Sequence, residues 1–378
     1  MAEYLTNTTD LTKVASAIRE KGGTSDSLVY PDGFVEAIQA IQTGTELKII
    51  VSVTSGATVT ATKGSLSVSG TSVNNSCTLT VPEEGEWTVS ATLGGETSPA
   101  KTVSVVSSYD ITVTFISTTL NDNSWEKIRE VSDKSEGANY WSIGDRKAIM
   151  LNGSIGNNAF QNIETYAFII GFNHNQELEG TNRIHFQLAK TALSGGTDVC
   201  LCNSNYYLHN NITSGAVFLM NNNPVNRGGW ESSLIRTKNC GINFSDTETI
   251  IRAVPEELRA VLKPVTKYTD NYANGGGWMS SYITATTDYF FLLSEFEVSG
   301  SIVYSNKYEA EKQAQYAYYS AGNSRIKYRY DITNTAAYWW LRSPYSSNSL
   351  DFIVVDKDAV IHQQNANYSL GFAPGFCV

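Results

Sequence analysis

Aromatic residues are spread very unevenly along this chain, and this constrains its organisation more than any other feature. The 378 residues include 7 Trp, 21 Tyr and 14 Phe, yet residues 1–107 hold only Tyr4, Tyr30, Phe34 and Trp87. Aromatic side chains dominate the burial of apolar surface in a core. The two parts of the chain therefore need different kinds of core, which predicts a domain boundary near residue 107. The length suits two or three domains.

Composition excludes several classes of function. The net charge is −10, and charged residues make up only 17% of the chain, which argues against general binding to nucleic acid or to an anionic membrane. We expect no signal peptide, because the first residues lack a basic region and an apolar region. No apolar run is long enough to span a membrane. The odd number of five cysteines predicts buried thiols rather than a disulfide framework or a metal site.

Residues 1–45 are predicted to be a helical segment for attachment or assembly. Asp10 can cap a first helix whose apolar stripe includes Leu11 and Ile18. After the turn at 31–33, a second short helix places Phe34, Ile38 and Ile41 on one face. Two such helices bury little alone, so they need to pack on each other or on a partner.

Residues 46–107 are predicted to form an all-β, immunoglobulin-like sandwich. Short alternating segments rich in β-branched residues are separated by Gly and Pro at close intervals, which is typical of this architecture. The expected strands are 47–53, 58–60, 66–68, 77–81, 87–91 and 102–105. Nothing in the segment indicates catalysis, and it is interpreted as a spacer or an adhesive module.

Residues 108–378 are predicted to be an α+β domain. One helix is expected at 125–131, capped by Ser124 or Asn123, and another is expected to begin at Pro255. Two similar motifs, Gly-Gly-Trp-Glu-Ser-Ser at 228–233 and Gly-Gly-Trp-Met-Ser-Ser at 276–281, recur in this part. A Trp after paired Gly residues suits close backbone packing, so Trp230 and Trp278 are both expected to be buried anchors.

The segment 339–378 alternates apolar strands with polar loops. Strands are expected at 338–344, 350–355, 360–364 and 371–378, with a turn at 356–359 and loops at 345–349 and 365–370. The loops combine Tyr, Ser and Asn, the residues that antibody-type binding surfaces use for rigid contact area and adaptable hydrogen bonds.

At Trp-Trp-Leu-Arg-Ser-Pro (339–344) and Gly-Phe-Ala-Pro-Gly-Phe (371–376) the chain resembles a C-terminal domain of tail proteins from phages and prophages of Gram-positive gut bacteria. The resemblance extends over most of 108–378, and residues 8–41 resemble a segment frequent at the start of such proteins. It implies a C-type-lectin-like fold and kinship with the variable proteins of diversity-generating retroelements.

The resemblance also implies a variable segment within 339–378 that binds a ligand. By position, the candidate ligand-binding residues are Tyr345, Ser347, Leu350, Asp351, Phe352, Val354, Asp356, Asp358, Val360, His362, Gln363, Gln364, Tyr368 and Leu370. Gln363 and Gln364 depart from the pattern, because changes of adenine alone cannot convert a pyrimidine-ending Asn codon to Gln.

The sequence therefore predicts a phage tail-associated, receptor-binding, adhesin-like protein of the virion, with no catalytic residue, metal or cofactor. The expected partners are a host cell-surface protein or glycan, other tail proteins through 1–45, and further copies of the chain, by analogy in a trimer. Three alternatives stay open. Asp356 and Asp358 offer oxygen ligands for calcium, a pair of carboxylates could cleave glycans, and the chain could be a purely structural decoration of the virion.

Overall fold

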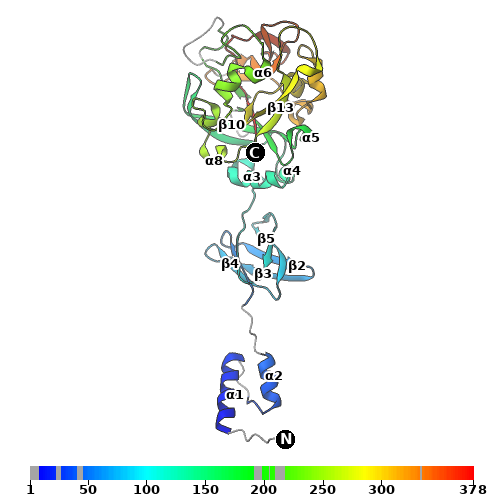
Figure 1. Ribbon diagram of the computed structural model, residues 1–378. Coiled ribbons are helices and arrows are strands. Elements are labelled where there is room, and N and C mark those ends of the chain that lie inside the picture. Colours follow the sequence, from blue (N-terminus) through cyan, green and yellow to red (C-terminus); the bar gives the residue numbers. More distant parts are fainter. Residues whose placement is uncertain are drawn as a thin grey trace. The chain divides into compact units, whose positions relative to one another are not determined.

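The computed structural model describes residues 8–22, 27–40, 46–190, 198–203, 205–208, 218–332 and 334–378. The chain divides into two compact units, one ending at Phe115 and the other beginning at Ile116. The architecture is rich in β-structure, with several separate sheets and mostly short helices (Figure 1). Among the described residues, no helix has both the length and the apolar character needed to cross a membrane.

The first unit begins with a pair of helices, α1 (Thr8–Gly22) and α2 (Asp32–Ala40). They pack on each other through a small core that centres on Ala15, Ile18 and Phe34. Asp10 lies inside the first turn of α1 rather than capping it, because the helix already includes Thr8. The expected apolar residue Ile41 lies outside the described residues, as do the ends of segment 1–45.

The remainder of the first unit is a β-structure of two sheets. Its strands are β1 (Lys48–Ser52), β2 (Thr58–Lys63), β3 (Leu66–Thr71), β4 (Ser76–Thr80), β5 (Gly85–Leu93), β6 (Glu96–Thr97), β7 (Lys101–Val105) and β8 (Tyr109–Thr112). One sheet has the order β4-β1-β8, and the other has the order β3-β2-β5-β6, with β7 also on β5. Alternate side chains of both sheets form one core around the fully buried Trp87. The predicted strands are thus confirmed.

The boundary expected at residue 107 falls before the last strand of this β-structure. Strand β8 pairs in parallel with β1, with Ile49 opposite Tyr109 and Ser52 opposite Thr112. Its exposed Tyr109 made the segment look like the start of the aromatic-rich part. The chain instead completes the first sheet before it enters the second unit, so the second unit begins at Ile116 rather than at 108.

The second unit contains many short elements. Its strands are β9 (Arg146–Ile155), β10 (Asn158–Phe172), β11 (Ile184–Lys190), β12 (Val199–Cys200), β13 (Val265–Asp270), β14 (Ile283–Asp288), β15 (Phe290–Phe291), β16 (Lys327–Arg329), β17 (Ala336–Ala337), β18 (Trp339–Pro344), β19 (Asp351–Val355), β20 (Ile361–Asn365) and β21 (Gly375–Cys377). Its helices are η1 (Leu120–Asp122), α3 (Trp125–Asp133), α4 (Gly137–Tyr140), α5 (Gln176–Glu179), α6 (Gly229–Ser232), η2 (Ile235–Cys240), α7 (Ile250–Ala253), α8 (Glu256–Arg259), η3 (Ser280–Tyr282), α9 (Glu295–Ser299), η4 (Lys307–Glu311) and α10 (Ala317–Ser320).

Two helix starts in this unit follow the sequence signals. Ser124 caps α3 by accepting a hydrogen bond from the Lys127 amide at 3.2 Å. Pro255 directly precedes α8, which is shorter than expected and ends at Arg259. In the C-terminal segment, the expected strands correspond to β18, β19, β20 and β21.

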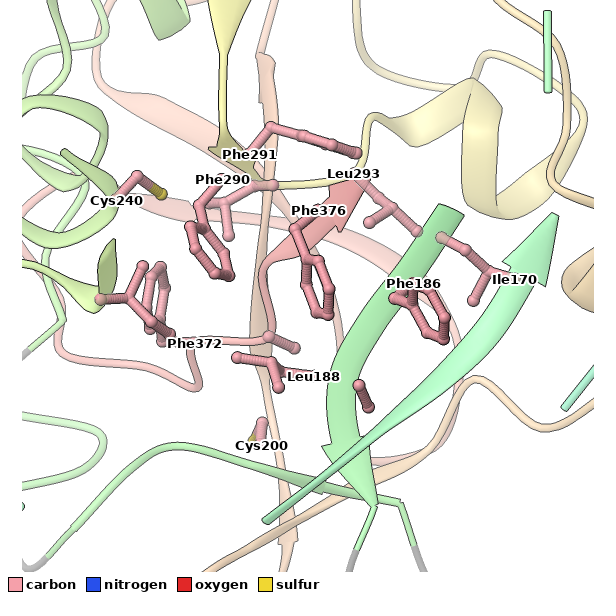
Figure 2. Packing of buried hydrophobic residues seen from close by; sticks show 14 of the residues in the cluster. Ile170, Phe186, Leu188, Cys200, Cys240, Phe290, Phe291, Leu293, Phe372 and Phe376 are labelled. Carbon is pink, nitrogen blue, oxygen red and sulfur yellow. The ribbon is translucent and has the colours of Figure 1, made fainter. Parts of the chain in front are cut away.

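The C-terminal strand β21 is an interior strand of the largest sheet of this unit, whose order is β15-β21-β11-β10-β9. Figure 2 shows Phe376 of β21 between Phe290 of β15 and Phe186 of β11, and both ring centroids lie 5.2 Å from that of Phe376. Residues 371–378 are all buried, as the sequence predicts. Strand β21 therefore joins two parts of the unit that lie far apart in sequence.

Truncating this central ring tests how much the unit depends on its last strand. Phe376→Ala should lower the free energy of unfolding by about 3–5 kcal/mol, because it leaves a cavity among rings that cannot collapse freely. Denaturant unfolding of the full chain measures the loss. Phe244→Ala is the control, since that ring is 37% exposed and its truncation should cost far less. Equal losses in the two variants would contradict the central role of β21.

Candidate functional site

A network of buried charges lies in the second unit. The guanidinium of Arg342 on β18 forms two hydrogen bonds with the Glu297 carboxylate of α9. The ammonium of Lys267 on β13 lies 2.9 Å from Glu297 and 2.7 Å from Glu179 of α5. The hydroxyl of Tyr316 accepts a further bond from Lys267 at 2.8 Å. All five side chains are buried, so this network joins four elements in the interior.

Burial and pairing change the pKa values in this network in opposite directions. Burial alone would raise the pKa of Glu297, but its ion pairs with Arg342 and Lys267 outweigh burial and hold the pKa below its usual value. Burial raises the pKa of Glu179 to about 7, although Lys267 acts in the other direction. Burial, assisted by Lys267, lowers the pKa of His174 to about 3, so this imidazole is neutral at physiological pH.

Three of these buried residues have the chemistry of metal ligands. His174, Glu179 and Glu297 each offer one ligand atom, and these atoms lie within 4.8 Å of one another. The ammonium of Lys267 already contacts both carboxylates. It supplies the positive charge that a bound cation would otherwise provide, so the arrangement fits a structural ion network better than a metal centre.

Helix α9, which carries Glu297 of this network, also holds a surface loop, 299–306, in one conformation. The carboxylate of Glu295 on α9 is fully buried and accepts hydrogen bonds from the backbone amides of Val303, Tyr304 and Ser305. A carboxylate that accepts several amide hydrogen bonds makes strong, charge-assisted contacts. The partly exposed ring of Tyr304 is therefore carried by a fixed backbone.

A buried asparagine fixes a second loop, 345–350. The Nδ2 atom of Asn226 lies within 3.0 Å of the carbonyl oxygens of Tyr345, Asn348 and Asp351. The Asp351 carboxylate in turn accepts hydrogen bonds from the side chains of Asn348 and Asn365. These contacts hold both ends of the loop against the body of the unit.

The third loop carries the most exposed tryptophan among the described residues. Trp278 is 52% exposed, and its Nε1 donates a hydrogen bond to Ser346 Oγ at 2.8 Å. The hydroxyl and the amide of Ser346 both donate to the carbonyl of Tyr304. The ammonium of Lys307 lies 5.2 Å from the Trp278 ring centroid. Ser346 thus joins all three loops.

Together these loops and the β19–β20 hairpin form a surface that we call the aromatic surface. The ring of Tyr304 lies 5.6 Å from Tyr345 and 6.4 Å from His362, measured between centroids. Its members are the exposed or partly exposed side chains of Trp278, Met279, Val303, Tyr304, Tyr345, Val360 and His362. Exposed aromatic and apolar side chains gathered in this way are typical of binding sites.

The structure places the fourteen predicted binding residues in different surroundings. Five are exposed, namely Ser347, Leu350, Asp358, Val360 and His362, and five are partly buried, namely Tyr345, Asp356, Gln363, Gln364 and Tyr368. Of these, Tyr345, Val360 and His362 belong to the aromatic surface. Tyr368 lies instead beside Tyr207, which also packs against Tyr338.

The remaining four predicted residues are buried, which corrects their prediction as ligand-binding residues on the surface. Phe352, Val354 and Leu370 have no exposed surface, and Asp351 is turned onto its asparagine partners. The physical reason is that β19 is the middle strand of the sheet β18-β19-β20, and its side chains are buried on both faces. Alternation of exposed and buried side chains applies only where one face of a strand meets water.

The turn that offered oxygen ligands has internal partners. Asp356 Oδ1 accepts hydrogen bonds from the amides of Asp358 and Val360, as in the turn that the sequence predicts at 356–359. The Asp358 carboxylate lies beside the ammonium of Lys357. The contacts within the turn therefore account for the presence of both acidic side chains.

Sequence reasoning missed Trp278, because the two Gly-Gly-Trp motifs differ in their surroundings. Trp230 is fully buried, as predicted, and a side chain at Gly229 would collide with the Asp270 carbonyl at 2.0 Å. Gly277 has nothing within 4 Å of that position, and Trp278 is exposed, so the prediction of a buried anchor was wrong there. The extra Gly275 was the available signal, since it lets the loop approach the backbone of Asn348 and Ser349 closely.

A family model described as a domain of unknown function (DUF6273) matches residues 201–378. The matched stretch contains every residue of the aromatic surface. No curated protein matches the chain.

The fully buried carboxyl of Glu309 gives a test of the polar interior. Burial raises its pKa from 4.5 to about 7, so the folded chain keeps a proton that the unfolded chain releases between these values. The stability due to the protonated form is present below about pH 4.5 and is lost as the pH rises through 7. Glu309→Gln keeps a neutral group at every pH.

We therefore compare the free energy of unfolding of Glu309→Gln with that of the unchanged chain. The difference should shift in favour of the variant by on the order of 3 kcal/mol between about pH 5 and about pH 8. Denaturant titrations of the full chain at several pH values measure it. Glu256→Gln, at an exposed position, is the control. Parallel pH curves for Glu309→Gln and the unchanged chain would contradict the assigned burial effect.

Proposed function

We propose that this chain is a phage tail-associated, receptor-binding protein that attaches to a host-surface ligand through the aromatic surface. The observation that carries the proposal is the position of Trp278, Tyr304 and Tyr345 on three loops that meet at Ser346. Large exposed aromatic rings lower the solubility of a surface that has no partner. Rings carried on a fixed backbone are well placed to contact a partner. No catalytic residue or cofactor forms part of the proposal.

The chemistry of the aromatic surface supports tight contact at low entropic cost. Tyr and Trp supply much contact area with few rotatable bonds, and the surrounding Ser and Asn residues supply adaptable hydrogen bonds. The hydrogen bonds of Glu295 and Asn226 fix the loops before a ligand arrives. Binding to a preorganised surface loses less conformational entropy.

The proposal extends to the other parts of the chain. The second unit is proposed to be a C-type-lectin-like domain whose loops vary between related proteins, and the β-structure before it an immunoglobulin-like spacer. The helical pair is proposed to attach the chain to other tail proteins and to further copies of itself, in a trimer, within the virion. Supporting this role, Val14, Val35 and Ile38 are about half exposed on a pair of helices with a very small core.

Attachment to intact cells tests the proposal. Labelled full-length chain is incubated with a panel of Gram-positive gut bacteria and compared with a triple variant, Trp278→Ala, Tyr304→Ala and His362→Ala. Loss of a central ring costs about 2 kcal/mol or more at a hot spot, which is about 30-fold in affinity. We expect the triple variant to lose at least this factor on the strains that bind the unchanged chain.

A matched control removes three exposed apolar side chains outside the aromatic surface, by Met150→Ala, Phe244→Ala and Ile332→Ala. Its binding should equal that of the unchanged chain, and thermal melts should show that both variants fold. Equal binding by the aromatic triple variant would refute the assigned surface. Failure of the unchanged chain to bind any strain would refute receptor binding on this host class.

A further inference from the structure

A depression lies next to the aromatic surface, between the loop 299–304 and the turn that leads into β20. Its volume is about 460 Å³, within the range of about 300–1,000 Å³ usual for small-ligand sites. Val303, Tyr304 and Val360 line the depression and also belong to the aromatic surface. The other wall is formed by Val360 and Ile361, and Arg325 provides its cationic side chain.

Within the part of the chain that the structure describes, no carboxylate compensates the charge of Arg325. Its side chain is partly buried, and among the described residues no carboxylate forms an ion pair with its guanidinium. Arg236, Arg329 and Arg342 of the same unit each pair with a carboxylate. Among the described residues, the only hydrogen bond of Arg325 is made by its backbone carbonyl, which accepts from Trp339 Nε1 at 3.0 Å.

The two carboxylates of α9, the helix that precedes the loop 299–304, already have partners inside the protein. Glu295 is fully buried and holds its carboxylate on the amides of the 303–305 segment, so it faces the protein rather than the depression. The hydroxyl of Ser299 bonds locally to the backbone of Ser301. The depression therefore presents an unpaired guanidinium, hydroxyl-bearing side chains and an apolar edge.

We propose that this depression is a subsite for the carboxylate of an acidic sugar residue in the ligand, an inference that rests on the proposed receptor-binding function. The guanidinium fork matches a carboxylate in two parallel hydrogen bonds. Val360, Ile361 and the Tyr304 ring contact the apolar face of the sugar, and Ser301 meets its hydroxyl groups. A rigid ring with both a carboxylate and hydroxyls satisfies all these features, whereas an acidic peptide side chain engages the guanidinium alone.

The chain's charge of −10 makes this subsite selective rather than generally attractive to anions. Long-range attraction is absent, so an acidic ligand gains only where its carboxylate reaches Arg325 directly. Binding is therefore expected to depend on the position of the carboxylate on the sugar and only modestly on ionic strength.

The test uses the full chain with free galacturonate, glucuronate and N-acetylneuraminate, each beside its neutral methyl ester. Affinity is measured by saturation-transfer NMR titration. At least one acid should bind at least tenfold more tightly than its ester. Arg325→Gln should remove this difference, Arg325→Lys should restore part of it, and Arg252→Gln, an equal loss of charge at an exposed site, should leave it unchanged.

Two further arms distinguish other anions. Inorganic phosphate and a hexaglutamate peptide are titrated against the same variants. Binding of either one through Arg325 as tightly as the best acidic sugar would overturn the assignment to a sugar. Nearly unchanged melting of Arg325→Gln is expected, because among the described residues the guanidinium forms no hydrogen bond and no ion pair, and the one hydrogen bond of this residue uses its backbone carbonyl.

The same variants in the cell-attachment assay separate this inference from the proposed function. Weaker attachment of Arg325→Gln, with inhibition by the best acidic sugar, supports both. Normal attachment of Arg325→Gln, with no Arg325-dependent sugar binding, overturns the subsite and leaves receptor binding in place. Arg325-dependent sugar binding without attachment to any strain supports the subsite and removes the receptor-binding proposal.

Discussion

The pairing of Arg342 with Glu297, extended through Lys267 to Glu179, is the interaction on which the arrangement of the second unit depends. A buried charge is very costly unless it is paired and hydrogen bonded, and each of these four side chains has its partners. Because the partners come from β18, α9, β13 and α5, none of these elements can shift without exposing an uncompensated charge. The hydrophobic core around Phe376 buries apolar surface, while the ion network restricts these four elements to one arrangement.

This interior constraint reaches the surface through short hydrogen-bonded connections. Glu297 and Glu295 lie on the same short helix, and Glu295 holds the amides of the loop that carries Tyr304. Tyr304 in turn accepts both hydrogen bonds of Ser346, which also anchors Trp278. The backbone that carries Tyr304 is therefore fixed by buried polar groups, and its ring also contacts Tyr345 and His362.

Local sequence patterns correctly predicted many of the strands and helices, but some of the predicted ligand-binding residues were misplaced. The strands of the first unit, the start of α3 and the burial of 371–378 followed from alternation, capping and apolar runs. Asp351, Phe352 and Val354 were predicted as ligand-binding residues by their position in the family resemblance, yet β19 is covered on both faces. Nothing local distinguishes a central strand from an edge strand of a hairpin, since strand order is a property of the whole sheet.

The sequence by itself determined the division into parts with different cores, the acidic and weakly charged surface, and the location of polar, aromatic loops near the C-terminus. These properties depend on composition and on neighbours within a few residues. Only the tertiary structure decided that Trp278 is exposed while Trp230 is buried, that Tyr304 joins Tyr345 and His362, and that Arg325 has no carboxylate partner among the described residues. Each of these depends on contacts between segments far apart in the chain, and the long-range packing of β-strands and loops decides which of those contacts form.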